Sequence, residues 1–155
     1  MFGVRRIFRV GRMVILFATF AVVAAHAAPS NQPTIEELKA RVASASIGDR
    51  PRLCVQIAER QLTEADKLYA ASEIEKGQAA LTDVVAFSEL ARDYAIQSHK
   101  YQKQTEIAAR SMTRKLTDLL HTLSHDEQAP VRDAIARLQR VRDDLLAAMF
   151  PKGAK

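Results

Sequence analysis

The sequence predicts an all-α fold, namely an elongated antiparallel bundle of about four helices with one long central helix, which follows a cleaved signal peptide. Three observations lead to this prediction. Apolar residues recur at spacings of three and four through most of the 155-residue chain, as they do in amphipathic helices. Residues 78–129 contain neither glycine nor proline. The first 27 residues combine arginines with a short apolar run, as secretory signals do.

The N-terminal segment, residues 1–27, is expected to direct export. It opens with four arginines and no acidic residue, and residues 13–25 form an apolar run interrupted by one threonine. That run is shorter than the roughly 20 apolar residues that a membrane-spanning helix needs. The small residues at positions 25 and 27 place cleavage between Ala27 and Ala28. We therefore expect a periplasmic or secreted protein without stable membrane insertion.

Two alternatives concern this segment. If cleavage does not occur, the apolar run would act as an N-terminal anchor. Arg5-Arg6-Ile7-Phe8 resembles the twin-arginine pattern, which implies export of the folded protein, whereas an ordinary secretory signal implies export of the unfolded chain.

The net charge of the exported chain argues against nucleic acid as a partner. The whole sequence carries +5, but four of its 23 basic residues lie in the signal and all 18 acidic residues follow it, which leaves +1 after cleavage. These charges are interspersed along the predicted helices rather than gathered in a basic patch, so the electrostatic attraction that nucleic-acid binding needs is lacking.

The exported chain is expected to fold as one helical bundle domain over residues 34–150. A linker at 28–33 precedes it and a frayed tail at 151–155 follows it. Thr34 and Glu37 fit a capping box, in which each side chain bonds the other residue's free amide, so the first helix starts there.

Prolines and glycines separate the other helices. Pro51 and Pro130 suit first helical turns, Gly77 lies near a turn, and Pro151 stops the last helix. We expect four helices, at about 34–47, 49–73, 77–123 and 130–149.

The third predicted helix is the longest because its seam keeps the alternation of three and four without a slip. The seam comprises Leu81, Val84, Ser88, Ala91, Ala95, Ser98, Gln102, Thr105, Ala109, Met112, Leu116, Leu119 and Leu123. The pattern favours one continuous helix of about 45 residues, roughly 65 Å long. Because the middle of the seam is polar, a bend within residues 97–106 is the alternative. Short turns make consecutive helices antiparallel neighbours, so the second helix should pack on the first half of the long one and the last helix on its second half.

Two short segments resemble known families. Residues 69–81 resemble the turn between the helices of a tetratricopeptide unit, which implies a helical hairpin that turns near residues 72–77. The sequence lacks a second copy of the unit, so a solenoid is not expected. Leu62-Thr63-Glu64-Ala65-Asp66 resembles the LTxxQ motif of small helical periplasmic stress proteins, with Asp66 replacing the glutamine. That resemblance implies binding of unfolded clients or sensing of envelope damage.

His121 and His125 form a candidate metal site. They are four residues apart, with Asp126 and Glu127 beside them, and would share a face if the helix continued that far. The helix dipole also favours histidines at a helix C-terminus without any metal. Metal binding is therefore an alternative function.

Phe87, Tyr94 and Tyr101 form a candidate interaction surface. Their spacing of seven places the three rings in one row beside the seam of the long helix. We expect these rings to pack within the bundle. If the second helix leaves the row uncovered, it becomes a contact surface for a protein partner.

The single cysteine, Cys54, excludes an intramolecular disulfide. We expect it to be buried on a helix face, and an intermolecular disulfide or a reactive thiol is the alternative. It lies on a different predicted hairpin from His121 and His125, so the sequence suggests no nucleophile and base pair for catalysis.

These features predict an exported, non-enzymatic helical protein that acts through helix–helix contacts in the cell envelope. The partner would be another protein or a second copy of the chain in a homodimer. We expect no cofactor. The alternatives are a periplasmic metal-binding protein, a chaperone-like envelope-stress protein and a structural spacer.

Overall fold

The computed structural model describes residues 32–151, and this part of the chain is all-helical. Its α-helices are, in chain order, α1 (Ile35–Ser44), α2 (Arg50–Ala70), α3 (Ile74–Ser98), α4 (Gln102–Leu120) and α5 (Gln128–Met149), and a short 3-10 helix, η1 (His125–Glu127), precedes the last. The all-α prediction is confirmed. The described residues form five α-helices, where the sequence predicted about four. Within this range, no helix combines the length and apolarity needed to cross a membrane.

Several predictions fall on residues that the structure does not describe. The signal peptide of residues 1–27 and the cleavage point between Ala27 and Ala28 lie outside the described residues, as do 28–31 of the linker and 152–155 of the tail. The capping box that ends the linker is described and confirmed. Thr34 N–H donates to Glu37 Oε2 at 2.8 Å, and Glu37 N–H donates to Thr34 Oγ1 at 3.2 Å.

The prediction of one continuous helix over residues 77–123 is wrong. The chain leaves α3 at Ser98 and enters α4 at Gln102, and two residues of the connection, His99 and Tyr101, have left-handed backbone angles of φ 56° and 59°. The Ser98 hydroxyl accepts a hydrogen bond from Lys100 N–H at 3.3 Å at the end of α3.

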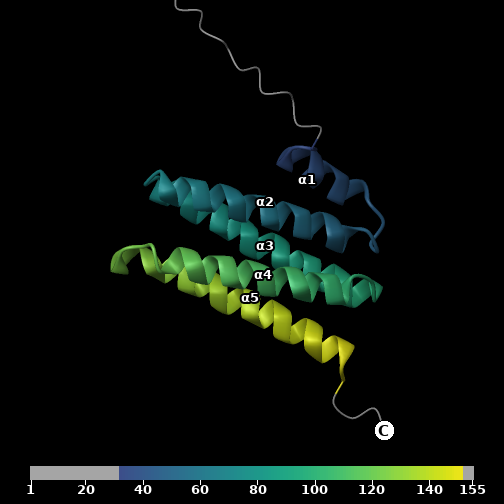
Figure 1. Cartoon of the computed structure of the whole chain (residues 1–155). Coiled ribbons are helices and arrows are strands. Elements are labelled where there is room, and N and C mark those ends of the chain that lie inside the picture. The colour runs from purple at the N-terminus through teal and green to yellow at the C-terminus, as the bar shows by residue number, and fades with distance from the viewer. Residues whose placement is uncertain (1–31, 152–155) are drawn as a thin grey trace, which may run out of the picture. The chain divides into compact units, whose positions relative to one another are not determined.

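The break lies in the polar middle of the seam, where the alternative prediction had placed a bend, but the chain reverses direction there (Figure 1). The physical reason is the distribution of apolar area along the seam. Its polar centre gains little from burial, whereas its two apolar halves gain about 25 cal/mol for each Å² removed from water when both reach one core.

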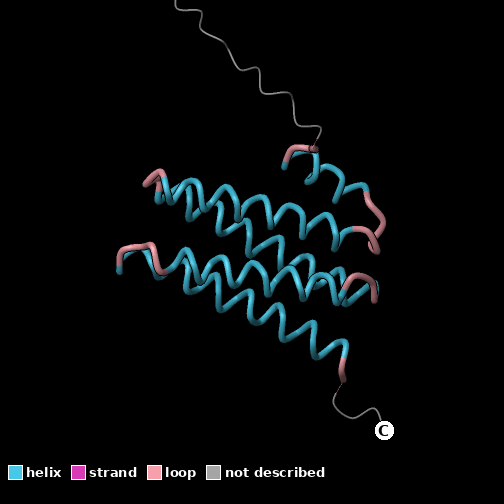
Figure 2. Tube along the Cα trace, viewed as in Figure 1, coloured by secondary structure: helices cyan, strands magenta, loops and turns pink. Residues whose placement is uncertain are grey.

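The helices form two antiparallel hairpins, α2–α3 and α4–α5, that pack against each other (Figures 1 and 2). Helix α5 lies along α3, and α1 packs on α2. The predicted neighbours, α2 with the first half of the seam and α5 with its second half, are therefore present. The elongated arrangement is not, because the hairpins lie side by side instead of end to end.

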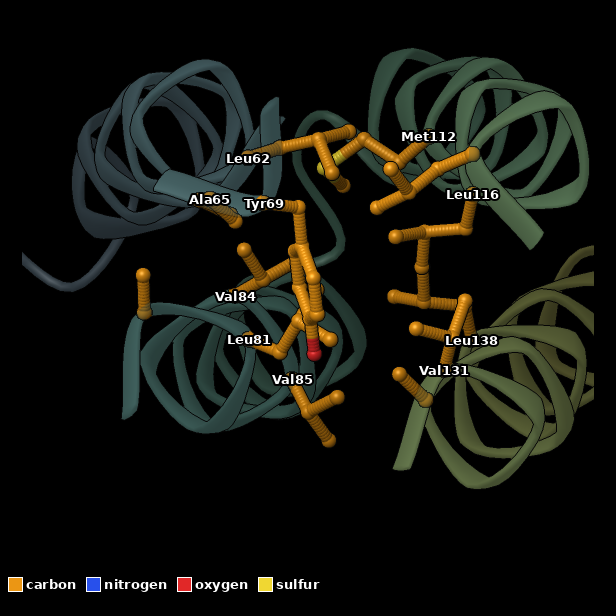
Figure 3. Close-up of a cluster of buried hydrophobic side chains, with 14 of the residues drawn as sticks. Leu62, Ala65, Tyr69, Leu81, Val84, Val85, Met112, Leu116, Val131 and Leu138 are labelled. Carbon is orange, nitrogen blue, oxygen red and sulfur yellow. The ribbon is translucent and has the colours of Figure 1, made fainter. Parts of the chain in front are cut away.

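The main core lies between the two hairpins. Figure 3 looks along it and shows side chains from α2, α3, α4 and α5 that meet at the centre. Its buried members include Leu62, Ala65, Tyr69, Leu81, Val84, Val85, Met112, Leu116, Val131 and Leu138. A second cluster joins Ala95 and Ala109 to Val141 and Leu145 near the α3–α4 connection. Under α1 lies a third, built from Leu38, Leu53 and Ile57.

Ion pairs between α3 and α5 join the two hairpins at their surface. The Arg137 guanidinium donates to both carboxylate oxygens of Glu89, at 3.0 and 2.8 Å. Arg92 donates to Asp144 at 2.9 Å. Bidentate pairs of this kind fix orientation as well as adding attraction.

Candidate functional site

A groove runs between α2 and α4 on the surface of the bundle. Its central hollow has a volume of about 480 Å³ and is lined by Leu62, Thr63, Asp66, Lys115, Asp118, Leu119 and Thr122. Between the same two helices, the side chains of Leu62 and Met112 reach toward each other (Figure 3). Because Leu62 and Leu119 are buried, the floor of this hollow is apolar and its rim is charged.

The groove extends in both directions beyond the central hollow. Asp66, Leu119 and Thr122 also line a hollow of about 430 Å³ that reaches the α2–α3 and α4–α5 turns. In the other direction, Thr63 and Lys115 also line a hollow of about 520 Å³ beside α1. A last hollow of about 260 Å³, at the α3–α4 connection, shares three lining residues with that one. The shared residues make these hollows one continuous depression.

Charge is distributed unevenly along the groove. The end beside α1 carries Arg41, Arg52 and Arg60 with a single acidic residue, Glu59. The opposite end carries Asp66 and Glu127, with no basic residue among its lining side chains in the described chain. Within residues 32–151, neither Asp66 nor Lys115 nor Asp118 forms an ion pair. These rim charges are therefore available to a ligand.

Phe87 and Tyr94 are covered by α1 and the start of α2. Both rings are half-buried. The Lys39 ammonium lies 5.7 Å from the centre of the Phe87 ring, and the Arg50 guanidinium lies 5.2 Å from that of Tyr94. Each ring therefore has a cation–π partner within its own chain.

Tyr101 does not continue the predicted row. It lies in the α3–α4 connection, at the N-cap position of α4, and lines the hollow at that end of the groove. The structure thus separates the three aromatic residues: Phe87 packs beneath α1, Tyr94 lies beneath the start of α2, and Tyr101 borders the groove.

His121 and His125 do not share a helical face. Helix α4 ends at Leu120, so His121 is its C-cap and His125 starts η1. Both side chains are exposed. Within residues 32–151, no group of three or more histidine, cysteine or acidic side chains is placed to hold a metal ion. The predicted i, i+4 geometry is corrected by the early end of α4, where Thr122 folds back through its hydroxyl to Leu119 O at 2.8 Å.

Cys54 is fully buried on α2, as predicted. Burial raises the pKa of its thiol to about 11, and the nearby Arg50 opposes that shift. The thiolate, which is the reactive form, is therefore scarce at neutral pH.

The groove residues were not identified from the sequence. The ordinary pattern of polar and charged residues on exposed helix faces accounts for Thr63, Asp66, Lys115 and Asp118, and only the approach of α2 to α4 brings them together. The one sequence signal was the segment 62–66, which resembles a stress-protein motif and lines the groove in part. Comparison with protein-family models, curated proteins and solved structures finds no match for this chain.

Proposed function

We propose that this is an exported, non-enzymatic protein that acts through helix–helix contacts, by binding an amphipathic helix of another envelope protein in the groove between α2 and α4. The groove is the observation that carries the proposal. It combines an apolar floor with a rim of charges that lack partners in the described chain. Export is inferred from the charged and apolar pattern of residues 1–27.

The length of the groove suits one helix. Its lining residues on α2 run from Arg52 to Ala70, which corresponds to roughly 27 Å at 1.5 Å per residue. A helix of about 18 residues would fill it. Helix-in-groove recognition uses apolar anchors at spacings of three, four and seven, and Val55, Leu62 and Leu119 provide apolar contacts along the groove.

The charge gradient along the groove favours one direction for the bound helix. A helix carries partial positive charge at its N-terminus and partial negative charge at its C-terminus. Its N-terminus would lie near Asp66 and Glu127, and its C-terminus near Arg41 and Arg52. The bound helix would thus run antiparallel to both α2 and α4.

The test is site-specific photo-crosslinking in the producing cell. A photoreactive residue replaces Thr63 or Asp118 in the groove, and Ala136 on the exposed face of α5 serves as the matched position. We expect one protein to be crosslinked from both groove positions and not from position 136. Identical products from all three positions would contradict the proposal.

Occlusion of the groove gives the specificity control. Thr63→Trp places a large ring over the central hollow without changing charge, and Ala136→Trp adds the same ring elsewhere. We expect Thr63→Trp to abolish the crosslink from position 118 and Ala136→Trp to leave it intact. Circular dichroism of both variants shows that the fold is retained.

A further inference from the structure

The α3–α4 connection joins the two hairpins through three residues, His99, Lys100 and Tyr101. His99 and Tyr101 adopt left-handed backbone angles that are unfavourable for residues with a Cβ atom, each by roughly tenfold in population. His99 is exposed, and its side chain forms no hydrogen bond within the described residues. The two left-handed residues strain this turn. Its side-chain support comes from Ser98, whose hydroxyl accepts a hydrogen bond from Lys100 N–H, and from Lys100, whose side chain lies beside Gly48.

The flanking sequence fits a straight helix through the same residues. Residues 78–129 contain no glycine or proline, and the seam of α3 continues into α4 with its spacing of three and four unbroken through Ser98 and Gln102. A straight helix over residues 99–101 would relieve both left-handed residues and form the backbone hydrogen bonds that the turn interrupts. Local sequence and tertiary structure thus favour different conformations at this connection.

The contacts between the hairpins do not depend on that connection. The main core and the ion pair between Glu89 and Arg137 join the α2–α3 hairpin to the α4–α5 hairpin. If the connection straightens, one chain loses these contacts with itself, but a second copy supplies the same surfaces. Short strained connections are a known route to domain exchange.

We propose that the chain forms a domain-swapped homodimer, in which α3 and α4 join into one long helix and each α4–α5 hairpin packs on the α1–α3 part of the second copy. The partner is a second copy of this chain because only it offers the complementary core and ion pairs. The inference does not depend on the groove, so the failure of one proposal leaves the other standing.

The first test is the oligomeric state of the full chain, in the form that the cell produces, after refolding at protein concentrations from about 1 µM to about 1 mM. Light scattering coupled to size exclusion gives the mass. We expect a dimer whose fraction grows with the concentration present during refolding. A monomer over the whole range would overturn the proposal.

Variants at His99 test the role of the strained turn. Glycine tolerates the left-handed angle and disfavours a helix, so His99→Gly should stabilise the turn. Since a dimer contains two such connections, we expect its dissociation constant to rise by roughly 100-fold or more. His99→Ala favours the helix without relieving the turn and should keep or increase the dimer. Ala136→Gly weakens α5 equally in the monomer and in the swapped dimer, so it should leave the dissociation constant unchanged.

Complementary charge reversal separates a swapped dimer from any other dimer. A chain with Glu89→Arg has two facing cations, and a chain with Arg137→Glu has two facing carboxylates. When the two chains are mixed and refolded together, a swapped heterodimer contains two opposite-charge pairs, whereas every monomer and homodimer keeps a repulsive pair. We expect heterodimers to exceed the statistical ratio by on the order of tenfold.

The matched control uses an ion pair within one exchanging unit. Lys39 and Asp83 lie 3.6 Å apart on α1 and α3, with exposure similar to that of Glu89 and Arg137. Mixing Lys39→Asp with Asp83→Lys chains should give no excess of heterodimer, because swapping does not recombine these residues. A dimer that shows no excess of heterodimer with the Glu89→Arg and Arg137→Glu chains would be unswapped. So would a dimer whose dissociation constant His99→Gly leaves unchanged. Either result would overturn the proposal.

Discussion

Tyr69 places a hydroxyl group inside an apolar core. Its side chain extends from α2 between α3 and α5 (Figure 3), it is 5 % exposed, and within the described residues the hydroxyl has no hydrogen-bond partner. Burial, with a smaller contribution from Glu127, raises the pKa of this hydroxyl, so it stays protonated. A buried hydroxyl without a partner costs about 1–3 kcal/mol.

Tyr69→Phe should therefore stabilise the protein. The substitution removes the unpaired hydroxyl and keeps the ring, so we expect the free energy of unfolding to rise by about 1 kcal/mol. Urea denaturation followed by circular dichroism measures the change. Tyr94→Phe is the matched control, because Tyr94 is half-buried, and it should change stability little. A loss of stability in Tyr69→Phe would show that the hydroxyl is hydrogen-bonded in solution.

Cys54 should make stability fall at alkaline pH. Its thiol titrates near 9.0 in the unfolded chain and near 11 in the folded one, so between these values only the unfolded state loses the proton. Stability is full below pH 9 and falls as pH rises toward 11, by roughly 3 kcal/mol in total. Denaturation at pH 8 and pH 10.5 measures the loss. Cys54→Ala should lose less stability over the same pH interval. Equal losses in the two proteins would show that the Cys54 thiol is not the cause.

At the scale of elements, α1 is a separate attachment to the bundle. It contacts α2, and its anchor Leu38 packs with Leu53 and Ile57 in a cluster distinct from the main core. Leu38 is 1 % exposed. The other helices retain their shared core without it.

Leu38→Ala should release α1 without unfolding the bundle. Truncation of a buried leucine costs about 2–5 kcal/mol. That is enough to open a ten-residue helix whose apolar contacts lie in one cluster and which is joined to α3 through the Lys39 side chain. We expect hydrogen exchange in α1 to accelerate at least tenfold while amides of α3 and α5 keep their protection. Val42→Ala, at a half-buried position of the same helix, should have a smaller effect. Uniform loss of protection in all helices would show that α1 folds cooperatively with the rest.

At the scale of the whole molecule, the core between the hairpins determines stability. Leu138 on α5 is fully buried in the main cluster, opposite residues of α2 and α3. Both hairpins therefore depend on it.

Leu138→Ala should destabilise every helix of the bundle together. We expect the free energy of unfolding to fall by about 3 kcal/mol, with helix content and the environment of the tyrosines lost in one coincident transition. Ala136→Gly, on the exposed face of the same helix, should cost only about 1 kcal/mol. If helix content and the tyrosine environment were lost in separate transitions, the two hairpins would unfold independently.

The sequence alone determined the α-helical class, the start of the first helix and most of the buried helix faces. Periodicity predicted the α-helical class, the capping box fixed the start of α1, and the seam positions Leu81, Val84, Met112 and Leu116 are buried as expected. Each of these features depends on neighbours three or four residues away, so a local pattern is sufficient to predict it.

Only the tertiary structure decided where the long seam turns and which surfaces stay open. The polar middle of the seam indicated a bend within residues 97–106, but no local signal indicated a full reversal at His99 and Tyr101, because neither residue is a glycine and the seam spacing continues across them. It arises because burial of both apolar halves of the seam in one core outweighs the local preference for a straight helix. That same reversal brings α4 beside α2 and so creates the groove, whose lining residues are distant in sequence and therefore invisible to any local pattern.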